Sequence, residues 1–136
     1  MKLAMQYGAS VGVATGAWMY LEYVLGFHEP DGIGRWTGFI SLLFPVIGAL
    51  LLVRRESVPD WGAAFAQGAV FGSMGGLLGA LAILCYFTLI NPRFSVGGRP
   101  VDPMSQATIG FVGALVLGVI LVPLIRLFAK QGSADV

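Results

Sequence analysis

Glu22 and His28 are the residues of this 136-residue chain whose types and positions are best placed for chemistry. Glu22 is the one acid or base inside a long apolar run, and it lies about five residues before the run ends, roughly 7 Å along a helix. A carboxylate at that depth in a membrane favours a cation, a polar cavity or protonation over contact with lipid. We expect a buried ion pair between Glu22 and Arg93, because Arg93 directly follows another apolar run. A proton- or cation-handling role for Glu22 is the alternative.

His28 shares a loop with two acids, Glu29 and Asp31. Nitrogen and oxygen ligands of this kind bind transition metals, but one histidine with two acids in a turn is more often simply solvated. We therefore expect no metal site.

The chain has no Ser-His-Asp set, phosphate-binding loop or H-E-x-x-H motif, so we expect no catalytic residues and no enzymatic activity. The single cysteine, Cys85, excludes a disulfide within the chain and is expected to be a small buried apolar residue.

Glycines recur at every fourth position in two of the apolar runs. Small residues at this spacing let helix backbones approach closely within a membrane. The stripes are Gly8, Gly12 and Gly16 in the first run and Gly68, Gly72 and Gly76 in the third, where Gly75 and Gly79 lie beside them. We expect them either to pack the first helix on the third or fourth, or to form a docking face. Such a face would fit another membrane protein or the flat rings of a lipid, quinone or pigment. The third helix carries small residues on two faces, so one is free to look outward.

The elements that position these residues are predicted by the distribution of charge. The chain holds eight Lys and Arg and seven Asp and Glu, and all except Glu22 lie outside four apolar runs at about 3–27, 36–53, 61–90 and 107–125. Each run is long enough to cross a hydrocarbon core of about 30 Å as a helix. Open sheets cannot cross lipid, and these runs lack the alternating pattern of a membrane barrel. We expect a single all-α domain, 1–136, with four transmembrane helices at about 3–27, 36–53, 61–90 and 107–128.

Two prolines and the basic residues refine this arrangement. Pro45 and Pro123 lie within helical runs, so each is expected to kink its helix and to free the carbonyl four residues earlier, at Ser41 and Val119. Lys and Arg residues bias insertion toward the cytoplasm. Five of them fall on the side of the two termini and three on the opposite side. We expect both termini in the cytoplasm.

The two halves of the chain show a weak internal similarity. The spacing of Gly8, Gly12 and Gly16 matches that of Gly68, Gly72 and Gly76, and Gly38-Phe39 matches Gly110-Phe111. Both matches preserve the direction in which the helices cross. This similarity is typical of two parallel-duplicated helical hairpins, although glycine is common enough here to produce chance matches.

Four short motifs run through most of the sequence. They are Gln6-Tyr7-Gly8, the segment from Leu21 to His28, Thr37-Gly38-Phe39, and Asn91-Pro92-Arg93-Phe94. With these motifs the chain resembles a bacterial family of small four-helix membrane proteins of unknown function, domain-of-unknown-function family 4199. The resemblance implies four helices in a bacterial inner membrane. It implies no activity, and it leaves Glu22 and His28 as motif members without a role.

Function is predicted mainly by exclusion. A net charge of +1 with dispersed basic residues excludes a nucleic-acid partner. A small chain with little mass outside the membrane and surplus close-packing surface favours a non-enzymatic accessory subunit. Its partners would be larger membrane proteins of a respiratory or photosynthetic type of complex, together with membrane lipids. The alternative is a small, oligomeric transporter or proton/cation conduit with Glu22 at its outer mouth. The sequence implies no cofactor, but a bound lipid, quinone or pigment is compatible with the glycine faces.

Overall fold

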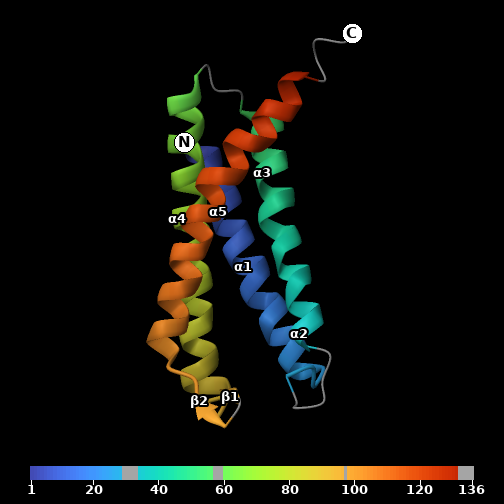
Figure 1. Ribbon diagram of the computed structural model, residues 1–136, viewed down its shortest axis with the longest axis vertical. Helices are drawn as coiled ribbons and strands as arrows, with labels where there is room; N and C mark the ends of the chain where they lie inside the picture. Colours follow the sequence, from blue (N-terminus) through green and yellow to red (C-terminus); the bar gives the residue numbers. More distant parts are fainter. Residues whose placement is uncertain (29–33, 57–59, 97, 132–136) are drawn as a thin grey trace.

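The computed structural model describes residues 1–28, 34–56, 60–96 and 98–131. The fold is all-α apart from one small hairpin (Figure 1). Its elements are α1 (Lys2–Val24), α2 (Gly34–Thr37), η1 (Gly38–Leu42), α3 (Leu43–Arg55), α4 (Trp61–Cys85), η2 (Tyr86–Ile90), β1 (Ser95–Val96), β2 (Arg99–Pro100) and α5 (Pro103–Gln131). The segments α2, η1 and α3 follow one another as one rod, and so do α4 and η2. With α1 and α5 they make a bundle of four rods.

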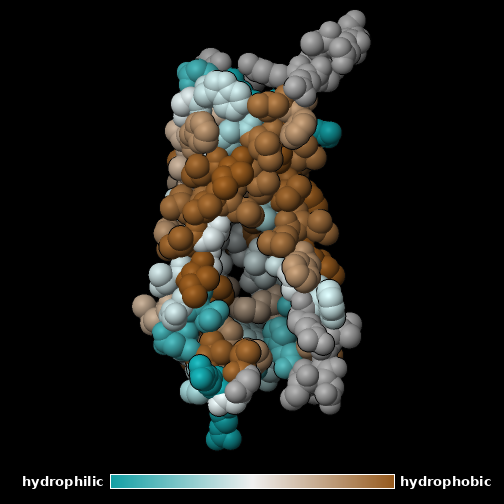
Figure 2. All heavy atoms as spheres, viewed as in Figure 1, coloured by the Kyte–Doolittle hydropathy of each residue, from teal (hydrophilic) through white to brown (hydrophobic). Residues whose placement is uncertain are grey.

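Three segments of the described chain are long and apolar enough to cross a membrane: Gly38–Arg55, Trp61–Ile90 and Pro103–Phe128. The face of the bundle seen in Figure 2 is apolar over its upper half, and the exposed apolar side chains of α5 include Val116, Ile120 and Leu124. These features are those of a multi-pass membrane protein. Helix α1 does not reach the same apolarity, because Gln6, Ser10 and Thr15 interrupt its apolar residues.

Pro45 changes the winding of its rod without leaving the Ser41 carbonyl free. A proline lacks the N–H group that would bond four residues back. The preceding turn is wound as the 3₁₀ segment η1, and the carbonyls of Ile40 and Ser41 accept backbone N–H groups at its end near Leu43. The tighter winding thus satisfies the carbonyl that the proline would otherwise leave unpaired.

Helix α5 begins and ends with specific polar contacts. The Asp102 side chain accepts a hydrogen bond from the Ser105 N–H at 2.8 Å, just before Pro103 opens the helix. The helix continues through the buried Pro123 and leans toward α3 (Figure 1). Near its end, the buried Arg126 donates to the Asp60 carbonyl, and its guanidinium lies 5.7 Å from the centre of the Trp61 ring. These contacts fix the end of α5 to the start of α4.

The apolar core lies toward the end of the bundle that holds the N-terminus. It consists of Ala4 on α1, Ala49 and Leu52 on α3, Phe71 on α4 and Val122 on α5, all of them buried. All four rods therefore meet at this end. We call it the core end, and we call the opposite end, where His28 and the hairpin lie, the His28 end. Toward the His28 end, α3 and α5 move apart (Figure 1).

The glycine stripes bring α1, α4 and α5 together. A Cβ added at Gly12 would lie 2.6 Å from the Gly75 carbonyl oxygen, so α1 packs directly on α4. On another face of α4, a Cβ at Gly72 would lie 2.6 Å from the Ala114 carbonyl oxygen of α5. Both small-residue faces of α4 are thus used inside the chain. Gly75 faces α1 and the stripe of Gly68, Gly72 and Gly76 faces α5, whereas an added Cβ at Gly79 would meet no atom within 4 Å.

The two matching stripes do not have equivalent neighbours. Gly8, Gly12 and Gly16 of α1 face α4, which belongs to the other hairpin. Gly68, Gly72 and Gly76 of α4 face α5, its own hairpin partner. A duplication of helical hairpins would place both stripes against the partner in the same hairpin. The packing gives the internal similarity no structural counterpart.

Candidate functional site

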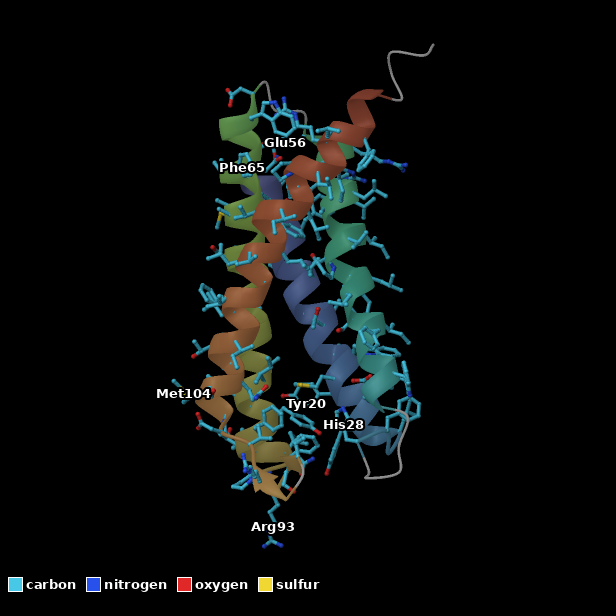
Figure 3. The ribbon with its side chains drawn as sticks, viewed as in Figure 1. Tyr20, His28, Glu56, Phe65, Arg93 and Met104 are labelled. Atoms are coloured by element: carbon cyan, nitrogen blue, oxygen red, sulfur yellow. The ribbon has the colours of Figure 1, made fainter. Side chains whose placement is uncertain are left out.

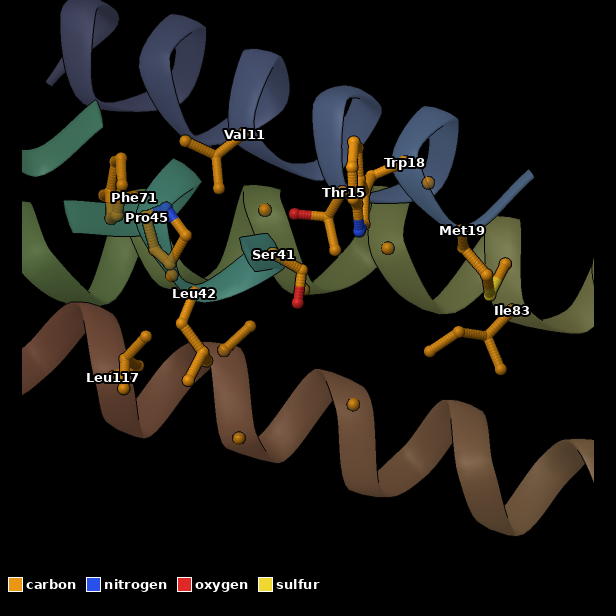
Figure 4. A pocket seen from close by; sticks show the side chains of 18 of the residues that line it. Val11, Thr15, Trp18, Met19, Ser41, Leu42, Pro45, Phe71, Ile83 and Leu117 are labelled. Atoms are coloured by element: carbon orange, nitrogen blue, oxygen red, sulfur yellow. The ribbon is translucent and has the colours of Figure 1, made fainter. Parts of the chain in front are cut away.

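A cavity of about 490 Å³ lies between the rods, where α3 and α5 move apart. Figure 2 shows it as a hollow on the side of the bundle, below the apolar band. Its walls carry apolar side chains from every rod, including Val11, Met19, Leu42, Ile83 and Leu117 (Figure 4). The polar groups on the walls are few. This composition is typical of a site for an apolar or amphipathic small molecule.

Two glycines on the cavity wall are not explained by helix packing. A Cβ added at Gly79 of α4 or at Gly113 of α5 would meet no atom within 4 Å. Both residues line the cavity. From the sequence we expected Gly79 to pack against a helix or form a docking face, like the other glycines of the two stripes. Its lack of a side chain instead leaves space in the cavity. The other seven members of that group lie where an added Cβ would press on a neighbouring helix.

Glu22 lies on the cavity wall toward the His28 end. It shares its helix face with Thr15 and Met19, which also line the cavity, and its side chain is only 6% exposed. Its Oε2 atom lies 3.5 Å from His28 Nε2, whereas Oε1 is buried without a hydrogen-bond partner among the described residues. A buried carboxylate oxygen with no donor is costly, so it is poised to accept a hydrogen bond from a bound molecule.

A hydrogen-bonded chain holds His28 beside Glu22. The Asn91 amide nitrogen donates to the Tyr86 hydroxyl oxygen at 3.2 Å, and the same hydroxyl lies 2.6 Å from His28 Nδ1. Tyr86 is buried, so its hydroxyl hydrogen needs an acceptor, and His28 Nδ1 is within reach. This arrangement assigns the proton of a neutral His28 to Nε2, which then faces Glu22. The Nε2 atom lies 3.5 Å from Glu22 Oε2, at the long end of a polar contact.

The backbone brings these groups together from both sides of the site. At the end of α1, Gly26 adopts a φ of 73°, a left-handed conformation that glycine tolerates best, and the Phe27 N–H donates to the Glu22 carbonyl at 2.9 Å. This turn folds His28 back over the helix end. On the other side, η2 is a π-helical turn, and the Asn91 N–H donates to the Tyr86 carbonyl at 2.8 Å. Such turns often occur at functional sites.

Arg93 does not pair with Glu22, contrary to the expectation from the sequence. It is exposed, and it points away from the helices at the tip of the molecule (Figure 3). Asn91 turns the chain out of η2 two residues earlier, which carries Arg93 past the helix ends. Among the described residues, His28 is the partner of Glu22.

We call Glu22, His28, Tyr86 and Asn91 the polar cluster. A second, smaller hollow of about 380 Å³ lies beside this cluster. It is lined by Tyr23, Val24, Gly26, His28 and Asn91. Glu22 therefore belongs to the apolar cavity, and His28 belongs to the outer hollow, with one contact between them. The cluster closes the cavity toward the His28 end.

A separate polar group occurs at the core end. The Met1 ammonium lies 2.9 Å from Glu56 Oε1, and this contact holds the pKa of Glu56 below its ordinary value. Glu56 is therefore ionised at neutral pH. Gln67 of α4 is also buried, and neither polar atom of its side chain has a hydrogen-bond partner among the described residues. This group is far along the bundle from the cavity end formed by Glu22 (Figure 3).

The remaining candidates from the sequence do not add to the site. Glu29 and Asp31, considered with His28 as metal ligands, lie outside the described residues. The described part of the chain contains no cluster of three metal-ligating acids, histidines or cysteines. Cys85 is exposed on α4, not buried as expected. The sequence analysis did not identify Tyr86 as a site residue. The only indication in the sequence was its position, five residues before the Asn91-Pro92 motif.

The motifs quoted from the sequence converge on this site. Glu22 and His28 come from the motif that ends α1, whereas Asn91 and Phe94 come from the motif after η2, and the rings of His28 and Phe94 lie 6.1 Å apart. The family model described as Protein of unknown function (DUF4199) matches residues 6–98, more than half of the chain. The chain belongs to this family. The DUF4199 match includes all the residues of the polar cluster and ends before α5. No curated protein and no solved structure matches the chain.

Proposed function

We propose that this DUF4199 protein is a non-enzymatic membrane protein that binds an amphipathic, lipid-soluble molecule between its helices. The cavity is the observation that carries the proposal. Its volume of about 490 Å³ falls within the range of small-molecule sites, about 300 to 1,000 Å³. The apolar walls suit a hydrocarbon chain or ring system, and the partnerless Glu22 oxygen suits one polar group. A lipid, a quinone or a pigment has this chemistry.

The proposed setting is a bacterial inner membrane, crossed four times. Helix α1 packs on α4 through its glycines and is long enough to cross beside the three more apolar segments. Its polar residues lower its hydropathy without preventing it from crossing inside a bundle. The excess of Lys and Arg at the core end supports cytoplasmic termini. The cavity then opens sideways toward lipid in the outer half of the membrane, where an amphipathic molecule would enter.

An accessory subunit of a larger membrane complex is a second use for the same opening. A helix of a partner protein would then lie between α3 and α5. The glycine stripes no longer support this hypothesis, since α1 and α5 cover them. A transporter or conduit needs a polar path across the membrane, whereas the described cavity lining is mainly apolar, with Thr15, Ser41 and Glu22 as its polar side chains. The cavity therefore favours a small-molecule ligand.

Substitutions that fill the cavity test the proposal. Gly79→Leu and Gly113→Leu place side chains in open space on the cavity wall, whereas Gly38→Leu adds the same side chain at an open position away from it. Each variant is purified in mild detergent, and the small amphiphiles that co-purify are quantified by mass spectrometry. We expect a stoichiometric amphiphile in the wild type and in Gly38→Leu, and its loss in both filling variants. Equal recovery from all four proteins would contradict the proposal, and a co-purifying protein in place of the amphiphile would favour the subunit hypothesis.

A further inference from the structure

The charge around Glu22 restricts what the cavity can hold. Among the described residues that line the cavity, Glu22 is the only acid or base. The basic side chains described at this end of the bundle, Arg93 and Arg99, are exposed on the loop and hairpin and make no ion pair with it. Among the described residues, His28 is the one that makes an ion-pair contact with Glu22. The balance of charge at the site therefore depends on whether the imidazole carries a proton.

In the hydrogen bonds of this cluster, His28 Nδ1 is the acceptor within reach of the Tyr86 hydroxyl hydrogen. A protonated imidazole donates from both nitrogens, so its Nδ1 would no longer accept from the Tyr86 hydroxyl. That hydroxyl already accepts from Asn91 at 3.2 Å, and the buried ring offers its hydrogen no other acceptor among the described residues. With a neutral His28, the imidazole, the Tyr86 hydroxyl and the Asn91 amide each have a hydrogen-bond partner. In this state, the described residues offer an ionised Glu22 no paired positive charge.

From this geometry we infer that the occupant of the cavity is a lipophilic monocation, an apolar body with one ammonium-type group that pairs with Glu22. The inference rests on the proposed function and specifies its ligand class. The ammonium donates to the partnerless Oε1 atom, while Oε2 faces His28 Nε2 at 3.5 Å. Trp18 on the cavity wall adds an aromatic surface, which also favours a cation. The apolar part then lies along the open glycine wall at Gly79 and Gly113.

A matched pair of photoreactive probes tests the charge requirement. The probes are a diazirine-bearing long-chain alkylamine and the alcohol of the same chain length, each applied to the protein in lipid nanodiscs. At neutral pH an alkylamine is protonated, since amines of this type have a pKa of about 10. Covalent labelling is quantified by intact mass, and the labelled residues are located by peptide mapping. We expect the amine to label residues of the cavity wall at least about tenfold more efficiently than the alcohol.

Variants of two carboxylates complete the experiment. Glu22→Gln keeps the shape of the side chain and removes its charge, so labelling by the amine should fall to the level of the alcohol. Glu56→Gln removes an ionised carboxylate at the core end, and it should leave labelling unchanged. The wild-type comparison of the two probes remains decisive even if Glu22→Gln does not fold.

The outcomes separate this inference from the proposed function. If both probes label the cavity wall equally, the cavity binds amphiphiles without regard to charge, and only the inference is overturned. If the amine labels the cavity but Glu22→Gln does not reduce its labelling, Glu22 is not the counter-ion, and the inference again fails. If neither probe labels the cavity wall, the proposed function fails together with the inference.

Discussion

The Tyr86 hydroxyl is the residue-scale feature on which the polar cluster depends. It accepts from Asn91 and lies 2.6 Å from His28 Nδ1, so Tyr86→Phe removes a partner from two other groups. Leaving buried polar atoms unpaired costs about 1–3 kcal/mol. We expect Tyr86→Phe to lower the free energy of unfolding by this amount, measured by reversible denaturation in detergent micelles.

Tyr20→Phe is the matched control for that substitution. The Tyr20 ring packs edge-on against Tyr86, but its hydroxyl makes only a long 3.4 Å bond to the Ala82 carbonyl. Its removal should cost less than about 1 kcal/mol. A loss as large as that of Tyr86→Phe would mean that the cluster is no more dependent on Tyr86 than on any nearby tyrosine.

The sequence predicted which face of α1 carries Glu22, but it did not predict which residue contacts Glu22. Helical periodicity placed Glu22 on the face of Thr15 and Met19, and all three line the cavity. It could not identify His28 as the partner, because that contact depends on the left-handed turn at Gly26. Arg93 was chosen by its nearness to a helix end in the sequence. The actual direction of the chain after Asn91 carries it away.

At the scale of the helix, two glycines of α4 should respond to alanine in opposite ways. A Cβ at Gly72 would lie 2.6 Å from the Ala114 carbonyl oxygen and 2.9 Å from Leu115 Cα, so Gly72→Ala must push α5 away. Overpacking of this kind costs about 1–3 kcal/mol. A Cβ at Gly79 meets open space, and alanine favours a helix over glycine by up to about 1 kcal/mol.

Thermal unfolding of both variants in detergent checks this difference. Gly72→Ala should melt below the wild type, and Gly79→Ala should melt at or above it. If the two substitutions lower the melting temperature equally, then Gly79 serves packing as Gly72 does, and the open glycine wall has no separate role.

Helix positions followed from the apolar runs because membrane-length segments must be helical to satisfy their backbones. The local departures from regular α-helix could not be predicted from these runs. The 3₁₀ winding before Pro45 replaces the free Ser41 carbonyl that a regular helix would leave. The π turn at Tyr86–Ile90 depends on how the chain exits toward the hairpin, and no single residue in that apolar stretch signals it. The cavity itself arises from helices moving apart, which a sequence pattern does not encode.

The whole molecule combines a tightly packed end with an open one. The buried core residues join all four rods at the core end, and the cavity lies between the core and the polar cluster at the His28 end. Close glycine contacts hold α4 against α1 on one side and against α5 on the other, so these helices can keep their places while α3 and α5 move apart toward the His28 end. One end therefore supplies stability, which allows the other to keep an apolar cavity beside a buried carboxylate.

The orientation of this bundle in the membrane is the prediction that concerns the whole chain. With four crossings both termini would lie on one side, and the distribution of Lys and Arg predicts that this side is cytoplasmic. A biotin-acceptor peptide at either terminus should then be biotinylated by a ligase confined to the cytoplasm, whereas the same peptide inserted after Gly98 in the hairpin turn should not. If α1 did not cross, the two terminal peptides would differ in labelling. If both terminal peptides stayed unlabelled while the hairpin peptide was labelled, the four crossings would stand, and the cavity would open toward the cytoplasmic half of the membrane.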